Sequence, residues 1–244
     1  MEPDEYQLMD EAEDGMWWYL ALHARVLDAL RPHRAARGPV LDAGCGTGGF
    51  LARLRRARPA GTVAGLEFNP DAAARARAKA GAPVAVGSVN AVPFADAAFA
   101  GLVSLDVLCH GAAEPDRALA EFHRVLRPGG MLVLNLPAFQ WLRSAHDVRV
   151  HTTRRFTAEE VRALLAKAGF AEVRTRYWNS LLFPLMVLQR KVLARGADKA
   201  SDVALPPPWL NRSLHAATGL ERRAAAAGLR FPAGGSVLAT AIRP

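Results

Sequence analysis

The sequence predicts an α/β fold with a doubly wound, mostly parallel sheet. Two observations carry this prediction. Short apolar runs of strand character alternate with segments of helical periodicity, and a glycine-rich turn follows the first of those runs. Alternating strands and helices imply parallel crossovers, with helices on both faces of the sheet. The 244 residues, 51% of them hydrophobic, suffice for one such domain with additions.

The first half of the chain contains most of the expected elements. Residues 1–14 are acidic and are predicted to form a mobile cap, and Met16–Leu30 has helical periodicity. Five apolar runs predict strands: Val40–Ala43, Thr62–Phe68, Val84–Val86, Leu102–Leu105 and Met131–Leu136. Helical patterns with glycine or proline stop signals predict the helices between them: Gly49–Ala57, Asp71–Ala80 and Pro115–Leu126.

The second half departs from this alternation. Thr157 is a predicted N-cap, with Glu160 reaching back to it, and that helix ends at Gly169. The segment between the last two strands holds a proline-rich linker and a further helix. The expected elements are strands at Val173–Tyr177 and Ser236–Ile242, with the helix around Leu214–Ala227 between them. The resulting division is a helical cap (1–37), a Rossmann-like core (38–178), a helical insertion or cap (179–233) and the last core strand (234–244).

The glycine turn after Val40–Ala43 predicts a nucleoside-containing ligand. Glycines permit positive φ angles and close approach of a ligand, and the following helix offers unpaired N–H groups. The glycines fit both the G-x-G-x-x-G spacing of dinucleotide enzymes and a tighter G-x-G-x-G spacing. Asp42 discriminates between the two, because a carboxylate there repels a pyrophosphate and suits an ammonium or sulfonium group.

With Cys45 and Thr47, this run resembles the signature of class I S-adenosylmethionine-dependent methyltransferases, reading L-D-x-G-C-G-T-G here. The likeness covers roughly residues 38–172 and is to the small-molecule branch. It implies a seven-stranded sheet of order 3-2-1-4-5-7-6 with the last strand antiparallel. It also implies S-adenosylmethionine as the cofactor and direct in-line methyl transfer to a small-molecule acceptor.

The resemblance assigns cofactor contacts around the turn. The turn itself would meet the methionine part of the cofactor through Gly44, Cys45, Gly46 and Gly48. Asp42 would lie near its ammonium group.

Further cofactor contacts follow the later strands. Glu67 would hold the ribose hydroxyls, and Phe68 would flank the adenine. Ser88 stands where many relatives have an aspartate, and Val89 can still bond the adenine edge through its backbone. Leu105 ends the fourth strand and completes the expected set. Asp106 follows it as a further polar strand end, with no role assigned.

Trp17, Trp18 and Tyr19 open the first long helix. They resemble the helix that closes over cofactor and substrate in this branch, although an aromatic face packed on the core is an equal alternative. We expect Tyr19 to bond the cofactor's carboxylate and Trp18 to contact the acceptor.

The expected acceptor side is rich in histidine. His110 follows the fourth strand and is the first candidate general base, although a lone histidine is more often structural. His146 and His151 are further catalytic candidates, and Arg154 is expected to bind the substrate. A solvated basic loop is an equally good interpretation of this cluster. We expect no metal, because the cluster lacks a cysteine or second carboxylate.

The net charge and the cysteine content limit which partners and which cellular compartment we expect for this protein. Lys and Arg outnumber Asp and Glu by 31 to 23, a net charge of +8 that we interpret as a solvated arginine-rich surface. We expect no nucleic-acid partner. Two cysteines and no signal peptide predict a cytoplasmic protein. The apolar segment 177–192 is expected to be a substrate cap, a homodimer contact or a peripheral membrane surface.

Two rival functions remain open. A nicotinamide-dependent oxidoreductase would share the sheet and Glu67, but Asp42 opposes it and no Tyr-x3-Lys pair is evident. A non-catalytic adenosyl-binding or partner subunit would keep the fold, and Ser88 and Cys109 leave this open.

Overall fold

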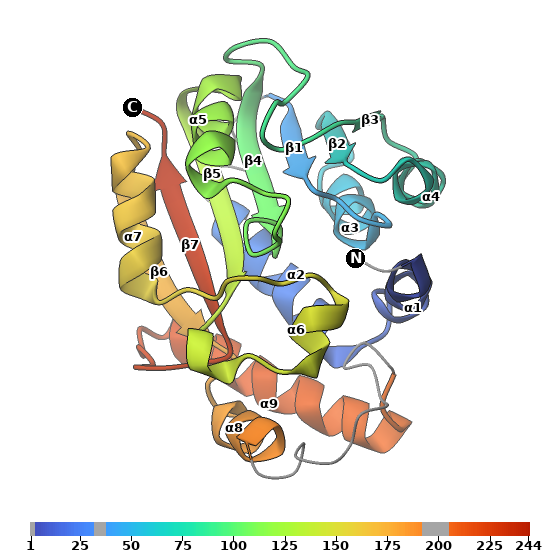
Figure 1. The fold of residues 1–244 in the computed structure, drawn as a ribbon, viewed down its shortest axis with the longest axis vertical. Helices are drawn as coiled ribbons and strands as arrows, with labels where there is room; N and C mark the ends of the chain where they lie inside the picture. Colours follow the sequence, from blue (N-terminus) through green and yellow to red (C-terminus); the bar gives the residue numbers. More distant parts are fainter. Residues whose placement is uncertain (1–2, 32–37, 192–204) are drawn as a thin grey trace.

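The computed structural model describes residues 3–31, 38–191 and 205–244 (Figure 1). These residues form a seven-stranded sheet of order β3-β2-β1-β4-β5-β7-β6. Strands β1 to β5 are parallel, whereas β7 runs antiparallel to both β5 and β6. The fold class and the implied strand order are therefore confirmed. The strands are β1 (Val40–Ala43), β2 (Val63–Glu67), β3 (Val84–Val86), β4 (Phe99–Leu105), β5 (Leu126–Pro137), β6 (Ala171–Trp178) and β7 (Ser236–Ile242).

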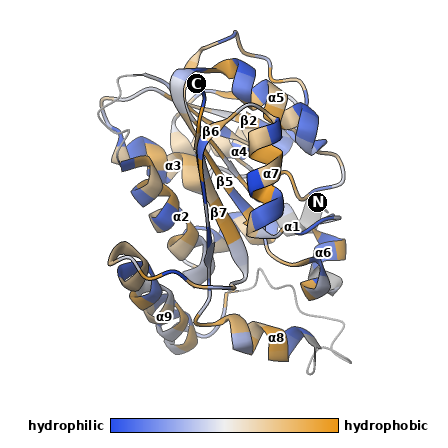
Figure 2. Cartoon of the chain, turned by 90° about the vertical axis from the view of Figure 1, so that its left-hand side faces the viewer, coloured by the Kyte–Doolittle hydropathy of each residue, from blue (hydrophilic) through white to orange (hydrophobic). Residues whose placement is uncertain are grey.

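Two hydrophobic cores lie on opposite faces of the sheet, because successive side chains of a strand point to opposite faces. Val40 of β1 packs toward α2, α3 and α4, whereas Leu41 packs toward α5 and α7. The helices that flank the sheet carry both hydrophobic and hydrophilic residues (Figure 2). They are α2 (Trp17–Leu30), α3 (Gly49–Ala57), α4 (Pro70–Ala80), α5 (Pro115–Val125) and α7 (Ala158–Lys167).

The remaining helices gather at the end of the sheet opposite the carboxyl terminus, where the parallel strands end (Figure 1). They are α1 (Pro3–Ala12), a short 3-10 helix (Gln140–Leu142), α6 (Ala145–Arg149), α8 (Phe183–Lys191) and α9 (Pro208–Ala226). Ligands of open α/β sheets bind at this end, so these helices surround the expected site.

Within the region predicted to be an acidic cap, Pro3–Ala12 forms helix α1. Lys79 on α4 holds the acidic face of this segment through ion pairs with Asp10 and Glu13. Glu13 also accepts a hydrogen bond from the hydroxyl of Thr47 at 2.8 Å. These basic and hydroxyl partners lie far along the chain, so the local acidic composition gave no sign of the packing.

Some element ends also differ from the prediction. Strand β4 begins at Phe99 and β5 at Leu126, because these two residues pair ahead of the main ladder. Helix α9 begins at Pro208, earlier than the Leu214 expected from its alanine and arginine pattern.

A buried network fastens α9 to the core. The Glu221 carboxylate accepts a hydrogen bond from Arg25 of α2 at 3.1 Å. It also accepts three backbone N–H bonds, from Asn179, Ser180 and Leu181, at 2.6–3.0 Å. One carboxylate thus joins α2, α9 and the chain that leaves β6.

None of the helices in the described residues has the length and apolar character needed to cross a bilayer.

Candidate active site

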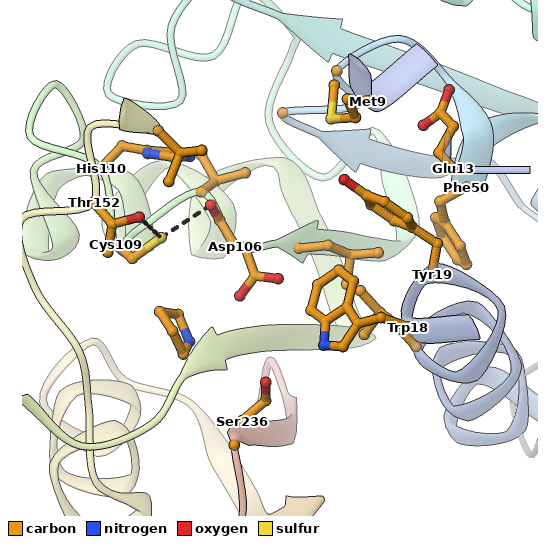
Figure 3. A pocket seen from close by; sticks show the side chains of 18 of the residues that line it. Met9, Glu13, Trp18, Tyr19, Phe50, Asp106, Cys109, His110, Thr152 and Ser236 are labelled. Carbon is orange, nitrogen blue, oxygen red and sulfur yellow. Dashed lines mark hydrogen bonds between the residues drawn. The ribbon is translucent and has the colours of Figure 1, made fainter. Parts of the chain in front are cut away.

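A cavity of about 710 Å³ opens at the carboxyl ends of the parallel strands (Figure 3). Its walls come from the turn after β1, the ends of β2 and β4, and helices α1, α2, α8 and α9. Two halves meet in it, one at the glycine turn and the other beyond the end of β4.

The glycine turn is tightly packed. Gly44, Gly46 and Gly48 have φ angles of 85°, 54° and 95°, which favour glycine. A Cβ on Gly44 would overlap the Val107 side chain, and one on Gly46 would lie 2.8 Å from the terminal carbon of Met9. The turn therefore cannot carry larger side chains in this conformation. Gly48 caps α3 and does not line the cavity.

Three carboxylates converge behind this turn. Asp42 is fully buried, and its Oδ2 has no hydrogen-bond partner among the described residues. Burial, with repulsion from Glu13 and Glu67, raises the pKa of Asp42 to about 8. Burial also raises the pKa of Glu13, against the opposing effect of Lys79. A ligand with a positively charged group suits these acids, because it restores the charge partner that burial has removed.

Glu67 ends β2 and is held on both oxygens. It accepts the Gly46 backbone N–H at 2.9 Å and the Asn69 backbone N–H at 3.0 Å. The Tyr6 hydroxyl of α1 donates to it at 3.4 Å. Its carboxylate therefore has a defined position at the edge of the turn.

The cavity continues past Glu67 along the ends of β2 and β3. Phe68 is 71% exposed and lines it, as do Ser88 and Val89. The Ser88 hydroxyl accepts the Asn90 backbone N–H at 3.1 Å, which holds the turn after β3. Leu105, at the end of β4, also borders the cavity.

Trp18 and Tyr19 line the cavity and are themselves packed. Their rings meet edge to face with centroids 5.1 Å apart, and Tyr19 lies 6.1 Å from His23. Burial lowers the pKa of His23 to about 3, so this histidine is a neutral part of the wall. Trp18 and Tyr19 therefore both face the cavity and pack on the protein core, so the two alternatives for this aromatic segment do not exclude each other.

Beyond β4, Asp106 lines the cavity, and hydrogen bonds from a neighbouring strand hold its side chain in place. Asn135 of β5 donates to both carboxylate oxygens of Asp106, at 3.0 and 2.9 Å. Trp178 of β6 in turn donates its indole N–H to the Asn135 side-chain oxygen at 2.7 Å. Burial raises the pKa of Asp106 to about 7.

The candidate histidines fall in different places. His110 lines the cavity, and its Nδ1 has no partner among the described residues; burial lowers its pKa. His151 is exposed and is not part of the cavity wall. His146 lies in α6, and its side chain is outside the described residues.

Arg154 points away from the cavity and donates to the Ala113 carbonyl at 2.6 Å. Its neighbour Arg155 lines the cavity instead. Arg155 forms a buried ion pair with Asp147, with hydrogen bonds of 2.9 and 3.0 Å.

Several residues of this site were missed from the sequence. Glu13 lines the cavity, and its partner Lys79 is distant in the chain. Asn135 and Trp178 support Asp106 from behind the lining, and they too meet only through a contact between distant segments. Asp106 did carry a signal, since it is a polar residue at the end of a strand.

Comparison with known proteins gives a consistent result. Residues 41–134 match the model of a family described as "Methyltransferase domain". The chain is 30% identical to a malonyl-[acyl-carrier protein] O-methyltransferase of Geobacter sulfurreducens, over 76% of this chain and 78% of the relative. It is also 30% identical to a 24-methylenesterol C-methyltransferase 2 of rice, over 77% of this chain but about half (49%) of that enzyme. In fold it resembles the crystal structure of a SAM-dependent methyltransferase from Thermotoga maritima, with a TM-score of 0.62, 19% identity and coverage of 99% and 95%.

Proposed function

Because this chain belongs to the class I S-adenosylmethionine-dependent methyltransferases, we propose that it methylates a small-molecule acceptor by direct in-line transfer. S-adenosylmethionine is its cofactor and supplies an activated methyl group on a sulfonium. The protein has to hold the acceptor behind that methyl group and exclude water.

The residues of the glycine-turn half fit this cofactor. The buried Asp42 oxygen without a partner suits the ammonium group, and the surrounding acids favour a cationic ligand. Glu67 would hold the ribose, with Phe68, Ser88 and Val89 beside the adenine. Tyr19 would meet the carboxylate from α2. A pyrophosphate would meet three acids here, which disfavours a dinucleotide.

The observation that carries the proposal is the extent of the cavity. It continues from the glycine turn past Asp106 to apolar side chains that include Leu182, just before α8, Met186 of α8 and Leu210 of α9. This space supports an acceptor with an apolar portion, with Trp18 and His110 as contacts. The two sequence relatives are named for different acceptors, a malonyl-[acyl-carrier protein] and a methylenesterol, so the acceptor varies among similar proteins.

Calorimetry with S-adenosylmethionine, S-adenosylhomocysteine and NAD tests the proposal. We expect both adenosyl ligands to bind and NAD not to bind. Formation of S-adenosylhomocysteine with a panel of alcohols, amines and carboxylic acids then identifies the acceptor. Binding without transfer to any of them would favour a non-catalytic adenosyl-binding subunit.

The segment 177–192 has two faces. Leu182 and Met186 line the cavity, whereas Leu181 and Leu188 are each 47% exposed. The lining residues favour a substrate cap over a homodimer or membrane surface. Stable co-sedimentation with anionic liposomes at physiological salt would reverse that preference.

A further inference from the structure

We propose that Asp106 receives the acceptor's proton during methyl transfer, and that the acceptor is consequently a hydroxyl or amine compound. This inference rests on the proposed function and deepens it, because it names the class of nucleophile.

The backbone aims this side chain into the cavity. Asp106 follows the last residue of β4 with a φ of 54°, a conformation that aspartate tolerates better than most residues. Its backbone N–H still donates to the Asn135 carbonyl at 2.8 Å, so the residue is anchored to the sheet. Asp106 lines the cavity, and Figure 3 shows its carboxylate close to Trp18 and Ser236. The group is therefore placed to meet an acceptor.

The supporting contacts leave the carboxylate available. Both of its oxygens accept from one neutral amide of Asn135, and no ion pair to it is found among the described residues. The Trp178 indole N–H orients that amide, so its NH2 group must face Asp106. A carboxylate has about four acceptor sites, so a ligand O–H or N–H can be added.

The charged groups around Asp106 do not occupy it. Arg155 acts on it at a distance and lowers its pKa, but that guanidinium is paired with Asp147. Burial keeps the Cys109 thiol protonated and lowers the pKa of His110. Burial dominates, and the pKa of Asp106 near 7 suits a group that exchanges protons at neutral pH.

The step balances. The acceptor's oxygen or nitrogen forms a bond to the methyl carbon as the carbon–sulfur bond breaks, and the electron pair of that bond remains on sulfur. The proton of the acceptor moves to an Asp106 oxygen. One positive charge, on the sulfonium, and one negative charge, on Asp106, are lost together. A carboxylate acceptor has no proton to give and would be repelled by Asp106.

An infrared titration tests the assignment without turnover. The C=O stretch of protonated carboxyl groups is followed from pH 5 to 9 in the ligand-free protein. We expect two titrating signals in this range, one near pH 7 from Asp106 and one near pH 8 from Asp42. Asp42→Asn should remove only the signal near pH 8 and the surface control Asp116→Asn should retain both, whereas Asp106→Asn should remove the Asp106 signal. Asn135→Leu should move the Asp106 signal to higher pH, because the amide hydrogen bond favours the ionised form. An unchanged spectrum in Asp106→Asn would overturn the assignment.

Binding of small probes tests the acceptor class. The protein saturated with S-adenosylhomocysteine is titrated with benzylamine, benzyl alcohol and benzoate. Benzylamine should bind roughly tenfold or more tightly than benzoate, and Asp106→Asn should abolish the difference. Equal or tighter binding of benzoate to the wild type contradicts the proposal.

Turnover separates this inference from the proposed function. With the acceptor from the screen, Asp106→Asn should bind S-adenosylhomocysteine within about twofold of wild type. Its kcat should nevertheless be roughly 100-fold or more below that of the wild type. The wild-type rate should fall at acidic pH, where Asp106 is protonated, and the variant should not show this fall. A variant that keeps both the rate and that pH profile refutes the role of Asp106. Failure of the wild type to bind adenosyl ligands refutes the proposed function instead.

Discussion

The two halves of the cavity are built in different ways. The glycine-turn half takes most of its groups from one stretch of chain, residues 42–68, and collects negative charge. The acceptor half contains Asp106, which follows β4, and hydrogen bonds link it to Asn135 of β5 and, through Asn135, to Trp178 of β6. A compact motif thus serves the cofactor shared by the family, whereas a dispersed set of residues serves the acceptor.

This difference makes the acceptor half depend on long-range packing. Arg25 of α2 lies 4.8 Å from the Trp178 ring and bonds to Glu221 of α9. The same Glu221 holds the backbone after Trp178. The hydrogen bonds that orient Asp106 through Asn135 and Trp178 are therefore connected to the Arg25–Glu221 ion pair, a clamp that joins α2 to α9.

Breaking that clamp should produce the largest effect. Glu221→Ala leaves Arg25 buried without its partner and removes the acceptor for three backbone N–H groups. We expect a loss of about 3–5 kcal/mol in the free energy of unfolding, measured by urea denaturation. Glu221→Gln should lower the free energy of unfolding less than Glu221→Ala does, and the exposed control Glu159→Gln should leave it almost unchanged. An unchanged unfolding midpoint in Glu221→Ala would mean that α9 is not clamped.

Removing the carboxylate of Glu67 should damage the glycine-turn half selectively. Glu67→Ala is expected to weaken S-adenosylhomocysteine binding by about 1.5–3 kcal/mol, through the loss of charge-assisted hydrogen bonds. Calorimetry measures this change, with Glu159→Ala as the remote control. Tyr6→Phe should have a smaller effect, because the Tyr6 contact is long at 3.4 Å. Wild-type affinity in Glu67→Ala would remove Glu67 from the cofactor site.

The buried acid Asp42 should make stability depend on pH. Its pKa of about 8 lies above the ordinary value, so between about pH 4 and 8 the folded protein holds a proton that the unfolded chain has released. The free energy of unfolding therefore falls as the pH rises through this range, by at most about 1.4 kcal/mol per pH unit. Asp106, with a pKa of about 7, adds a change of the same sign.

Thermal unfolding of the ligand-free protein from pH 5 to 9 checks this slope. Asp42→Asn should make the dependence of stability on pH less steep, and the remaining slope should be the contribution of Asp106. A slope that Asp42→Asn leaves unchanged would show that Asp42 is ionised in the folded protein over this range.

The smallest expected effect concerns an exposed ring. Phe68→Ala should weaken S-adenosylhomocysteine binding by about 1 kcal/mol through lost stacking, with no change in the free energy of unfolding. Trp209, 69% exposed on α9, is the matched control, because Trp209→Ala should leave this affinity unchanged. Equal losses in the two variants would contradict the assignment of Phe68 to the adenine side.

The predictability of each part follows from how local its interactions are. The strand and helix at the glycine turn agree with the structure residue for residue, because their signals lie within one short segment. The packing of α1 was not predictable, since Asp10 and Glu13 pair with Lys79 of α4, which is distant in the chain. Arg154 was chosen over Arg155 because the sequence does not reveal which of two adjacent side chains faces a cavity.

By itself, the sequence determined the fold class, the cofactor and the position of the glycine turn. The fold class and the turn depend on hydrophobic periodicity and on residues that act within a few positions of one another, and the cofactor follows from the resemblance of that turn to a family signature. Only the tertiary structure joined Asp106 to Asn135 and Trp178, and brought α8 and α9 over the cavity. Such contacts require the strand order 4-5-7-6, so their geometry exists only once distant segments have packed into one sheet.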